Sequence, residues 1–297
     1  MSKPARRFSL VQMDVFSANV LEGNPLAVIT DARGLSDSEM QAVAREMNLS
    51  ETTFIFPREP EVERERGVKV RIFTVSEELP FAGHPTLGTA FVLRGASGAP
   101  RVELDLKVGK VPVCFEEHSG QPVFGEMRQI DPEMGEVHSR EAVAAAIGLE
   151  PENLAADLPI QTVSTGVPFI IVPLRSLAVA QRLKVDWSRT SEYLERTQGH
   201  FFYFVAREGV DRGSRLHTRM FFYNGEDPAT GSAAGCAAAW MVAHGVARPG
   251  ERVLIEQGVE MRRPSRIFVR ADQDGNRVVN VRVGGNAVEV LRGEVVL

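Results

Sequence analysis

Polar and small residues are concentrated at the start of an expected alanine-rich helix in the second half of the chain. The stretch GEDPATGSAAGCAAAW, residues 225–240, passes from a turn-prone run into that helix at Gly231 and Ser232. A helix start carries unpaired N–H groups and the positive end of a dipole, and glycine lets a ligand approach the backbone closely. Such a start can bind a small carboxylate. The alternative is that Thr230 or Ser232 only caps the helix, and residues 225–240 taken alone favour capping.

The same pattern occurs in the first half and indicates an internal duplication. Residues 71–95 align without gaps with residues 219–243 at a shift of 148, and GNPLAVI (23–29) aligns with GVPFIIV (166–172) at a shift of 143. We therefore expect two similar halves, each with a strand, a loop and a helix start; two unrelated units that share turn chemistry are the alternative. Six of the 25 positions in the longer alignment are identical, where average residue usage would give roughly one or two: Arg71/Arg219, Phe73/Phe221, Glu78/Glu226, Pro80/Pro228, Gly83/Gly231 and Ala90/Ala238.

The duplication suggests a paired binding site. If the two halves pack face to face, the helix starts at Gly83–His84 and Gly231–Ser232 converge on one cleft and can hold an anion together. Asn19 and Asn24 are candidates to reach this cleft, although Asn24 also suits a turn because it precedes a proline. A small molecule with a carboxylate is the expected ligand.

Many strands and few helices are expected around these residues. Ser36 and Glu39 form a capping box ahead of an apolar stripe, so a helix is expected over 36–47. The charged run EVERERGVKVR (61–71) indicates a solvated strand and its approach, and the Gly- and Pro-containing stretch 120–134 indicates a linker. Further strands are expected at 8–16, 21–30, 52–56, 68–75, 102–117, 160–174, 201–207, 215–223 and beyond 250; further helices are expected at 85–94, 139–147, in two pieces over 176–198, and from about 233.

Composition excludes several other classes of protein. The chain has 297 residues, enough for about two domains, and its 43% hydrophobic and 25% charged residues are ordinary for a globular protein. A net charge of −5 argues against a nucleic-acid partner. Cys114 and Cys236 lie far apart, which gives neither metal-ligand nor disulfide spacing and fits a reducing cytoplasm. GxGxxG and P-loop patterns are lacking, so we expect no dinucleotide, NTP or other cofactor site.

Membrane and metal sites are not expected either. The basic segment MSKPARR (1–7) is followed by an apolar stretch that Asp14 interrupts, which is not a signal peptide. The longest apolar run, around 233–243, is too short to cross a bilayer. His217 stands at an alternating position in a strand, which suits a structural role, and nothing in the spacing of Glu51, His84 and His217 supports a metal site.

Four motifs give the chain a resemblance to a known family. MDVFSANVLEGNPLAVI (13–29), LSETTFIFP (49–57), ELPFAGHPTLGTA (78–90) and DPATGSAAG (227–235) resemble, in order and spacing, those of the phenazine-biosynthesis PhzF-like family, which has the diaminopimelate-epimerase-like fold. The motifs cover the whole chain. Val75 departs from the family pattern, which has proline after RIFT, but it lies outside the proposed chemistry.

The resemblance implies a fold and an assembly. It implies two pseudo-symmetric domains, each a curved, mostly antiparallel, barrel-like sheet around a central helix, with the active-site cleft between them. The last strand is expected to return to the first domain, which places the N-terminal domain at 1–120 plus about 286–297 and the C-terminal domain at 121–285. The fold class implied by the resemblance is α+β, and the implied assembly is a homodimer.

The resemblance further implies roles for individual residues. Glu51 would be the general acid/base, with His84 and Asp227 as polar partners that orient the substrate or relay protons. Considered alone, Glu51 is more simply an exposed charge at the start of a strand. The Gly83 and Gly231 backbones, the Ser232 hydroxyl and, from the first strands, Asn19 would bind the substrate.

Residue identity decides between two kinds of proton chemistry. Related epimerases place a cysteine just before the glycine at each helix start, but here those positions are Ala82 and Thr230, and neither is a base at neutral pH. A single carboxylate can instead move a proton between two carbons on one face of a flat substrate. We therefore expect a cofactor-independent isomerase of the trans-2,3-dihydro-3-hydroxyanthranilate isomerase type, acting on a small cyclic or conjugated carboxylic acid. The alternatives are a non-catalytic member that binds small carboxylates or a protein, and an amino-acid epimerase.

Overall fold

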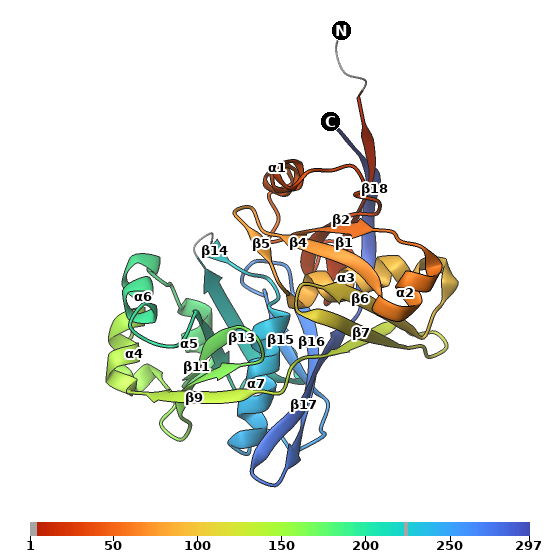
Figure 1. Cartoon of the computed structure of the whole chain (residues 1–297). Helices are drawn as coiled ribbons and strands as arrows, with labels where there is room; N and C mark the ends of the chain where they lie inside the picture. Colours follow the sequence, from red (N-terminus) through yellow and green to blue (C-terminus); the bar gives the residue numbers. More distant parts are fainter. Residues whose placement is uncertain (1–4, 223–224) are drawn as a thin grey trace. The chain divides into compact units, whose positions relative to one another are not determined.

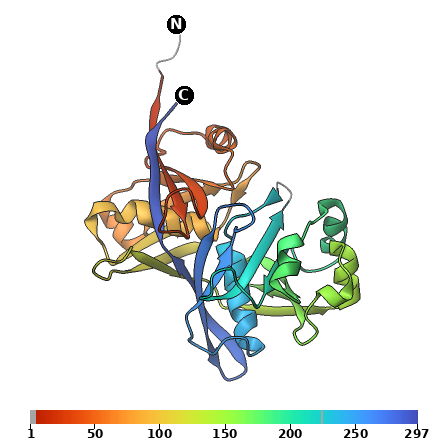
Figure 2. The same ribbon diagram turned by 180° about the vertical axis from the view of Figure 1, so that it is seen from behind.

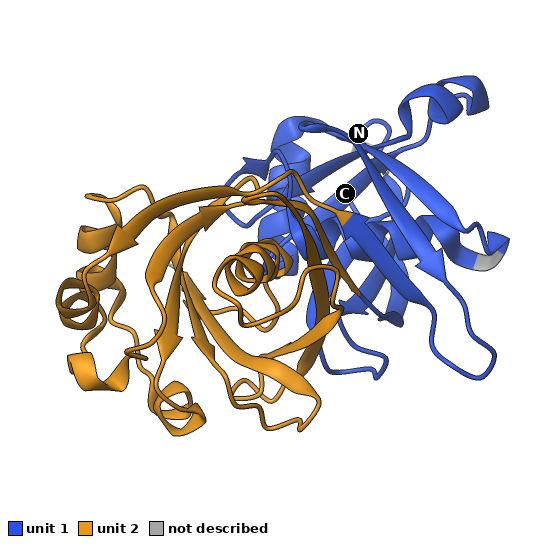
Figure 3. Cartoon of the chain, turned by 90° about the horizontal axis from the view of Figure 1, so that it is seen from below, with its two compact units in different colours: residues 1–127, 285–297 blue, residues 128–284 orange. Residues whose placement is uncertain are grey.

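The chain folds into two compact units. The computed structural model describes residues 5–222 and 225–297. Unit 1 comprises residues 1–127 and 285–297, and unit 2 comprises residues 128–284 (Figure 3). The first four residues, part of the segment that the sequence argues is no signal peptide, lie outside the described residues, as do two residues of the predicted strand and repeat, 223 and 224.

Unit 1 is a curved sheet with one central helix, α3 (Gly83–Arg94). Its strands hydrogen-bond in the order β18–β1–β2–β3–β4–β6–β7–β8, with β2–β3 and β4–β6 parallel and the other pairs antiparallel. The first and last strands of the chain, β1 and β18, lie side by side in this unit (Figures 1 and 2). The other elements are β1 (Arg7–Val15), β2 (Asn24–Ile29), α1 (Asp37–Met47), β3 (Thr52–Phe56), α2 (Pro60–Arg66), β4 (Val68–Phe73), β5 (Glu78–Leu79), η1 (Gly95–Ser97), β6 (Arg101–Leu106), β7 (Gly109–Glu116), β8 (Phe124–Arg128) and β18 (Ala287–Val296).

Unit 2 repeats this plan around the helix α7 (Gly231–Ala243). Its strands hydrogen-bond in the order β9–β10–β11–β12–β13–β15–β16–β17, with β11–β12 and β13–β15 parallel and the other pairs antiparallel. In Figure 3 its strands curve around a helix. The other elements are β9 (Glu133–His138), α4 (Arg140–Ile147), η2 (Pro151–Asn153), β10 (Ile160–Ser164), β11 (Pro168–Leu174), α5 (Leu177–Arg182), α6 (Trp187–Leu194), β12 (Phe201–Ala206), β13 (Ser214–Phe222), β14 (Gly225–Glu226), β15 (Val253–Gln257), β16 (Ser265–Asp274) and β17 (Arg277–Gly285).

The internal duplication extends to single hydrogen bonds. In unit 1, Arg71 on β4 donates through Nε and Nη2 to Glu78, over 2.7 and 2.8 Å. In unit 2, Arg219 on β13 donates through the same atoms to Glu226, over 2.7 Å each. These residues are equivalent at the shift of 148 that the sequence indicates, so the prediction of two similar halves is confirmed.

The two central helices are buried on nearly all sides because their side chains are small. In α7 the described structure buries eleven of the residues from Gly231 to Val242, leaving Ser232 half-buried. Gly88 of α3 is required for close packing, since an added Cβ would lie 2.6 Å from Val15 Cγ2 and 2.7 Å from Leu26 Cδ2. Within the described residues, no helix is long and apolar enough to cross a membrane.

One predicted element is wrong. The charged run 61–71 begins with a helix, α2, rather than with the approach to a strand; this helix buries none of its residues, so no apolar periodicity marks it. The boundary between the two units falls within the predicted linker over 120–134, which also contains β8 and the start of β9. Both central helices also begin two residues earlier than predicted, at their glycines.

Candidate active site

Glu51 and His84 lie together in unit 1. Glu51 directly precedes β3, and His84 is the second residue of α3, so strand and helix each fix one partner. His84 Nε2 lies 3.4 Å from Glu51 Oε2, with the two side chains 5% and 15% exposed. The Glu51 carboxylate is therefore mostly buried rather than a solvated charge, and it faces a group that can exchange a proton.

Asn24 indicates which ring nitrogen of His84 carries the proton. The Asn24 Nδ2 atom lies 3.3 Å from His84 Nδ1, and an amide nitrogen only donates, so Nδ1 accepts. Burial lowers the pKa of His84 to about 3, so the ring is neutral at pH 7. A neutral ring that accepts at Nδ1 carries its proton on Nε2. The protonated Nε2 is the ring nitrogen that lies 3.4 Å from Glu51 Oε2.

Asp227 occupies the corresponding loop of unit 2. It is buried between β14 and α7, and its backbone N–H donates to Met220 O over 3.0 Å. Its Oδ2 accepts a hydrogen bond of 2.6 Å from the Thr230 hydroxyl. The hydroxyl that stands where related epimerases have a thiol is thus bonded to a carboxylate.

Neither central helix is capped by a side chain. Ala82 is the N-cap of α3 and Thr230 is the N-cap of α7, and neither makes a side-chain cap hydrogen bond. Thr230 donates to Asp227 instead, and Ser232 lies inside the helix. The alternative that these residues crowd the helix start only to cap it is therefore wrong, whereas the other N-caps at Ser36 and Ser139 do accept such bonds.

Asn19 makes its hydrogen bonds within its own loop. Its side chain is exposed and donates to Glu22 Oε2 over 3.1 Å, and its backbone N–H donates to Ser17 Oγ. Asn24, which the sequence also suits to a turn, is the asparagine that contacts His84. Its motif, GNP ahead of an apolar strand, is a turn signal, so no sequence pattern separates the two asparagines.

The polar residues of the two units differ at equivalent positions. Strand pairing sets Phe54 opposite Arg71 and Phe204 opposite Arg219, so Glu51 corresponds to Phe201 three residues earlier. At the shifts of 148 and 143, His84 corresponds to Ser232 and Asn24 to Val167. Unit 2 therefore has no counterpart of the Glu51–His84–Asn24 group.

The thiols are unsuited to proton transfer. Cys236 is buried within α7, and burial raises the pKa of its thiol to about 11. Cys114 is exposed on β7. The expected reading of Cys236 as a small packing residue agrees with this burial.

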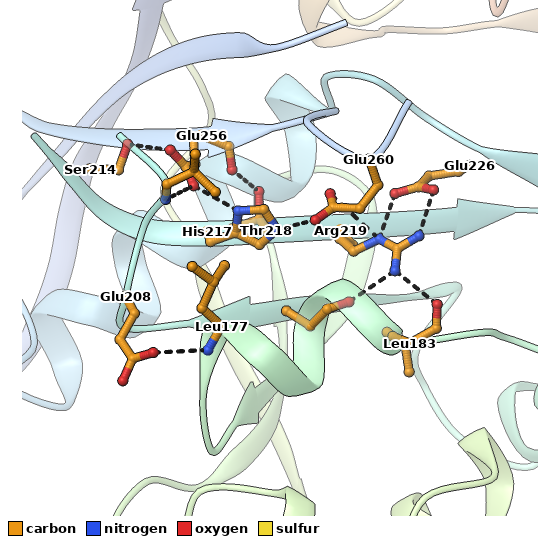
Figure 4. Close-up of polar contacts among 12 residues, drawn as sticks. Leu177, Leu183, Glu208, Ser214, His217, Thr218, Arg219, Glu226, Glu256 and Glu260 are labelled. Atoms are coloured by element: carbon orange, nitrogen blue, oxygen red, sulfur yellow. Dashed lines mark hydrogen bonds and ion pairs between the residues drawn. The ribbon is translucent and has the colours of Figure 1, made fainter. Parts of the chain in front are cut away.

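A second buried polar cluster in unit 2 surrounds His217 (Figure 4). His217 Nδ1 lies 2.7 Å from Glu256 Oε1, and Nε2 lies 3.1 Å from Glu260 Oε1. Burial alone would lower the pKa of His217, but its hydrogen bonds to the two carboxylates outweigh burial and raise the pKa to about 9. The histidine is charged and fully paired, which fits the structural role predicted for it. Among the described residues, no group of His, Cys, Asp and Glu is arranged to hold a metal ion.

The chain is similar to known proteins over nearly its whole length. The family model described as phenazine biosynthesis-like protein, PhzC-PhzF, matches residues 13–293. An uncharacterized isomerase of Mesorhizobium japonicum is 37% identical over 95% of this chain and 96% of its own length. The trans-2,3-dihydro-3-hydroxyanthranilate isomerase of Pseudomonas aeruginosa is 35% identical over 97% of this chain and 99% of its own. The crystal structure of a PhzF-family phenazine biosynthesis protein of Bacillus anthracis matches with a TM-score of 0.88 and 28% identity, over 98% of this chain and 100% of that one.

Proposed function

The chain belongs to the phenazine biosynthesis-like (PhzC-PhzF) family, and we propose that it is a cofactor-independent isomerase that moves a proton and a double bond on a small cyclic or conjugated carboxylic acid. The observation that carries this proposal is the buried Glu51 carboxylate 3.4 Å from a neutral His84. Relatives of the chain are named isomerases, in line with the enzyme class expected from the sequence.

In the proposed reaction Glu51 is the general acid/base. Its carboxylate takes a proton from one carbon of the substrate, and the resulting acid returns a proton to another carbon on the same face. His84, whose Nε2 lies 3.4 Å from the carboxylate, is the polar partner that orients the substrate or relays protons. Asp227 acts as a further polar partner that orients the substrate.

One base rather than two is supported by the difference between the units. A racemase needs an acid/base on each face of the reacting carbon. Phe201, the equivalent of Glu51, cannot exchange protons, and Ala82 and Thr230 replace the thiols of related epimerases. The buried Cys236 thiol does not supply one.

The substrate carboxylate is assigned to the helix starts. The Gly83 and Gly231 backbones lie at the first residues of helices that no side chain caps, where N–H groups favour an anion. The half-buried Ser232 hydroxyl adds a donor. Asn19 stays a predicted substrate contact, and trans-2,3-dihydro-3-hydroxyanthranilate, named for the Pseudomonas relatives, is the first compound to test.

The proposed cellular setting is based on composition and on the family resemblance. We propose that the enzyme works in the cytoplasm as a homodimer without nucleic-acid or membrane partners, and that each compact unit is one of the two predicted domains. The net charge of −5 supports the lack of a nucleic-acid partner, and the two separate cysteines support a reducing compartment. Light scattering of the purified chain tests the dimer, which a monomeric mass would contradict.

Replacing Glu51 tests the proposed chemistry. Glu51→Gln keeps the shape of the side chain and removes its basicity, so turnover should fall by about three orders of magnitude or more. Ligand binding should change little. The control is Glu46→Gln, the same replacement at an exposed position of α1 in the same unit. Turnover by Glu51→Gln at the wild-type rate removes Glu51 from the mechanism.

A further inference from the structure

A series of buried hydrogen bonds connects Tyr203, Gln257 and Thr230 to the Asp227 carboxylate. Tyr203 and Gln257 are fully buried, and the Tyr203 hydroxyl lies 3.0 Å from Gln257 Oε1. Gln257 Nε2 donates to the Thr230 hydroxyl over 2.9 Å, and that hydroxyl donates to Asp227 Oδ2 over 2.6 Å. Three strands or loops of unit 2 thus converge on one carboxylate.

The backbone fixes which way the Gln257 amide points. Its nitrogen lies 2.7 Å from the backbone oxygen of Asp227, which only accepts. Its oxygen lies 3.2 Å from the backbone N–H of Thr230, which only donates. A flipped amide would lose both bonds, so Nε2 faces the Thr230 hydroxyl.

This orientation sets the direction of the remaining protons. Because Thr230 Oγ1 accepts from Gln257, its own proton is free to go to Asp227 Oδ2. Tyr203 is held as a neutral phenol, since burial raises its pKa, and it can donate to Gln257. The bonds from Gln257 to Thr230 and from Thr230 to Asp227 therefore each direct a donor towards the carboxylate, whereas the single Tyr203 proton is shared between Gln257 Oε1 and Thr218 Oγ1, which lies 2.9 Å away.

Unit 1 has the equivalent strand, loop and helix start but lacks this series of hydrogen bonds. At the shift of 148, Asp227 corresponds to Leu79 and Thr230 to Ala82. His217 pairs with Glu256 as Lys69 pairs with Asp105, so the next residue along, Gln257, corresponds to the buried Leu106. The fold of a unit thus does not require an amide at this position.

We propose that Gln257, acting through the Thr230 hydroxyl, is a positioning residue that sets the orientation of the Asp227 carboxylate. The step to catalysis rests on the proposed function, in which Asp227 orients the substrate. Gln257 itself does not touch the substrate. Its amide bonds the backbone of both Asp227 and Thr230, and the Thr230 hydroxyl bonds the Asp227 carboxylate.

Crystal structures of variants test the positioning directly. In Gln257→Leu, which introduces the residue that unit 1 has at this position, the Asp227 carboxylate should rotate away from its bond with Thr230. Thr230→Val, which removes only the hydroxyl, should have the same effect and serves if Gln257→Leu does not fold. The control is Gln161→Leu, because Gln161 is a buried glutamine of β10 that donates to a different backbone oxygen, that of Gly135. An unchanged Asp227 rotamer in either test variant overturns the proposal.

Kinetics separate positioning from general stability. Thr230→Val, which loses the hydrogen bond to the Asp227 carboxylate, should lower kcat by about tenfold, and Gln257→Leu, which acts through the same bond, should lower it by about as much. Thr230→Ser, which keeps a hydroxyl, should restore most of the rate. In an Asp227→Asn background Gln257→Leu should cause little further loss, whereas multiplying effects would contradict action through Asp227. If the wild type turns over no candidate acid, the proposed function fails, and the crystal structures still decide the positioning.

Discussion

Raising the pH above neutrality is predicted to destabilise unit 2 through one buried histidine. His217 is fully buried and sits between the carboxylates of Glu256 and Glu260, which raise its pKa to about 9 despite burial. In the unfolded chain the pKa of a histidine is near 6.5. Folding therefore favours the charged form, and this contribution to stability is fully present below pH 6.5 and is lost as the pH rises through about 9.

The size of the effect follows from the two pKa values. At about 1.4 kcal/mol for each pH unit, the difference between about 9 and 6.5 corresponds to about 3 kcal/mol at low pH. About 2 kcal/mol of this should disappear between pH 7 and 9.5. His217→Gln, which cannot titrate, should be less stable than the wild type at pH 7 but should lack this additional loss at higher pH.

Urea unfolding followed by tryptophan fluorescence measures this difference. Both tryptophans of the chain, Trp187 and Trp240, belong to unit 2, so the signal reports the unit that contains His217. His118→Gln, at an exposed histidine of unit 1, is the control and should behave as the wild type. Parallel loss of stability by wild type and His217→Gln between pH 7 and 9.5 would refute the reasoning.

Two further predictions concern the central helix of unit 2. Gly235→Ala should lower the free energy of unfolding by about 1–3 kcal/mol, because the added Cβ would lie 1.9 Å from the buried Gln129 Oε1, which accepts from Thr165; an unchanged urea midpoint would show that Gln129 moves aside freely. Iodoacetamide should modify the exposed Cys114 and spare the buried Cys236 in the folded protein, which peptide mass mapping can show, and turnover should be unchanged. Rapid modification of Cys236 with loss of turnover would instead support a thiol mechanism.

The sequence could predict the elements whose physical causes are local. The capping box at Ser36 and Glu39 and the N-cap at Ser139 mark helices that the structure contains. The Arg and Glu residues that recur at a shift of 148 predict a duplication. In the structure they form the same bidentate pair in each unit. Local chemistry of this kind does not depend on the rest of the fold.

Features that depend on tertiary contacts could not be predicted. Helix α2 is charged all round and carries no periodic signal. Asn24, rather than Asn19, reaches His84 because β2 runs beside α3, which no spacing in the sequence shows. Gln257 lies 30 residues from Asp227 and reads as the end of an apolar strand, so only strand pairing reveals its contact with the loop.

Solvent deuterium exchange tests the central claim most directly. Wild type, Glu51→Gln and Glu46→Gln would each be mixed with trans-2,3-dihydro-3-hydroxyanthranilate in deuterated buffer and followed by NMR. A single-carboxylate isomerase predicts rearrangement with deuterium incorporated on carbon by wild type and Glu46→Gln, and neither rearrangement nor incorporation by Glu51→Gln. Rearrangement with deuterium incorporation by Glu51→Gln at the wild-type rate would contradict the claim that Glu51 carries the proton.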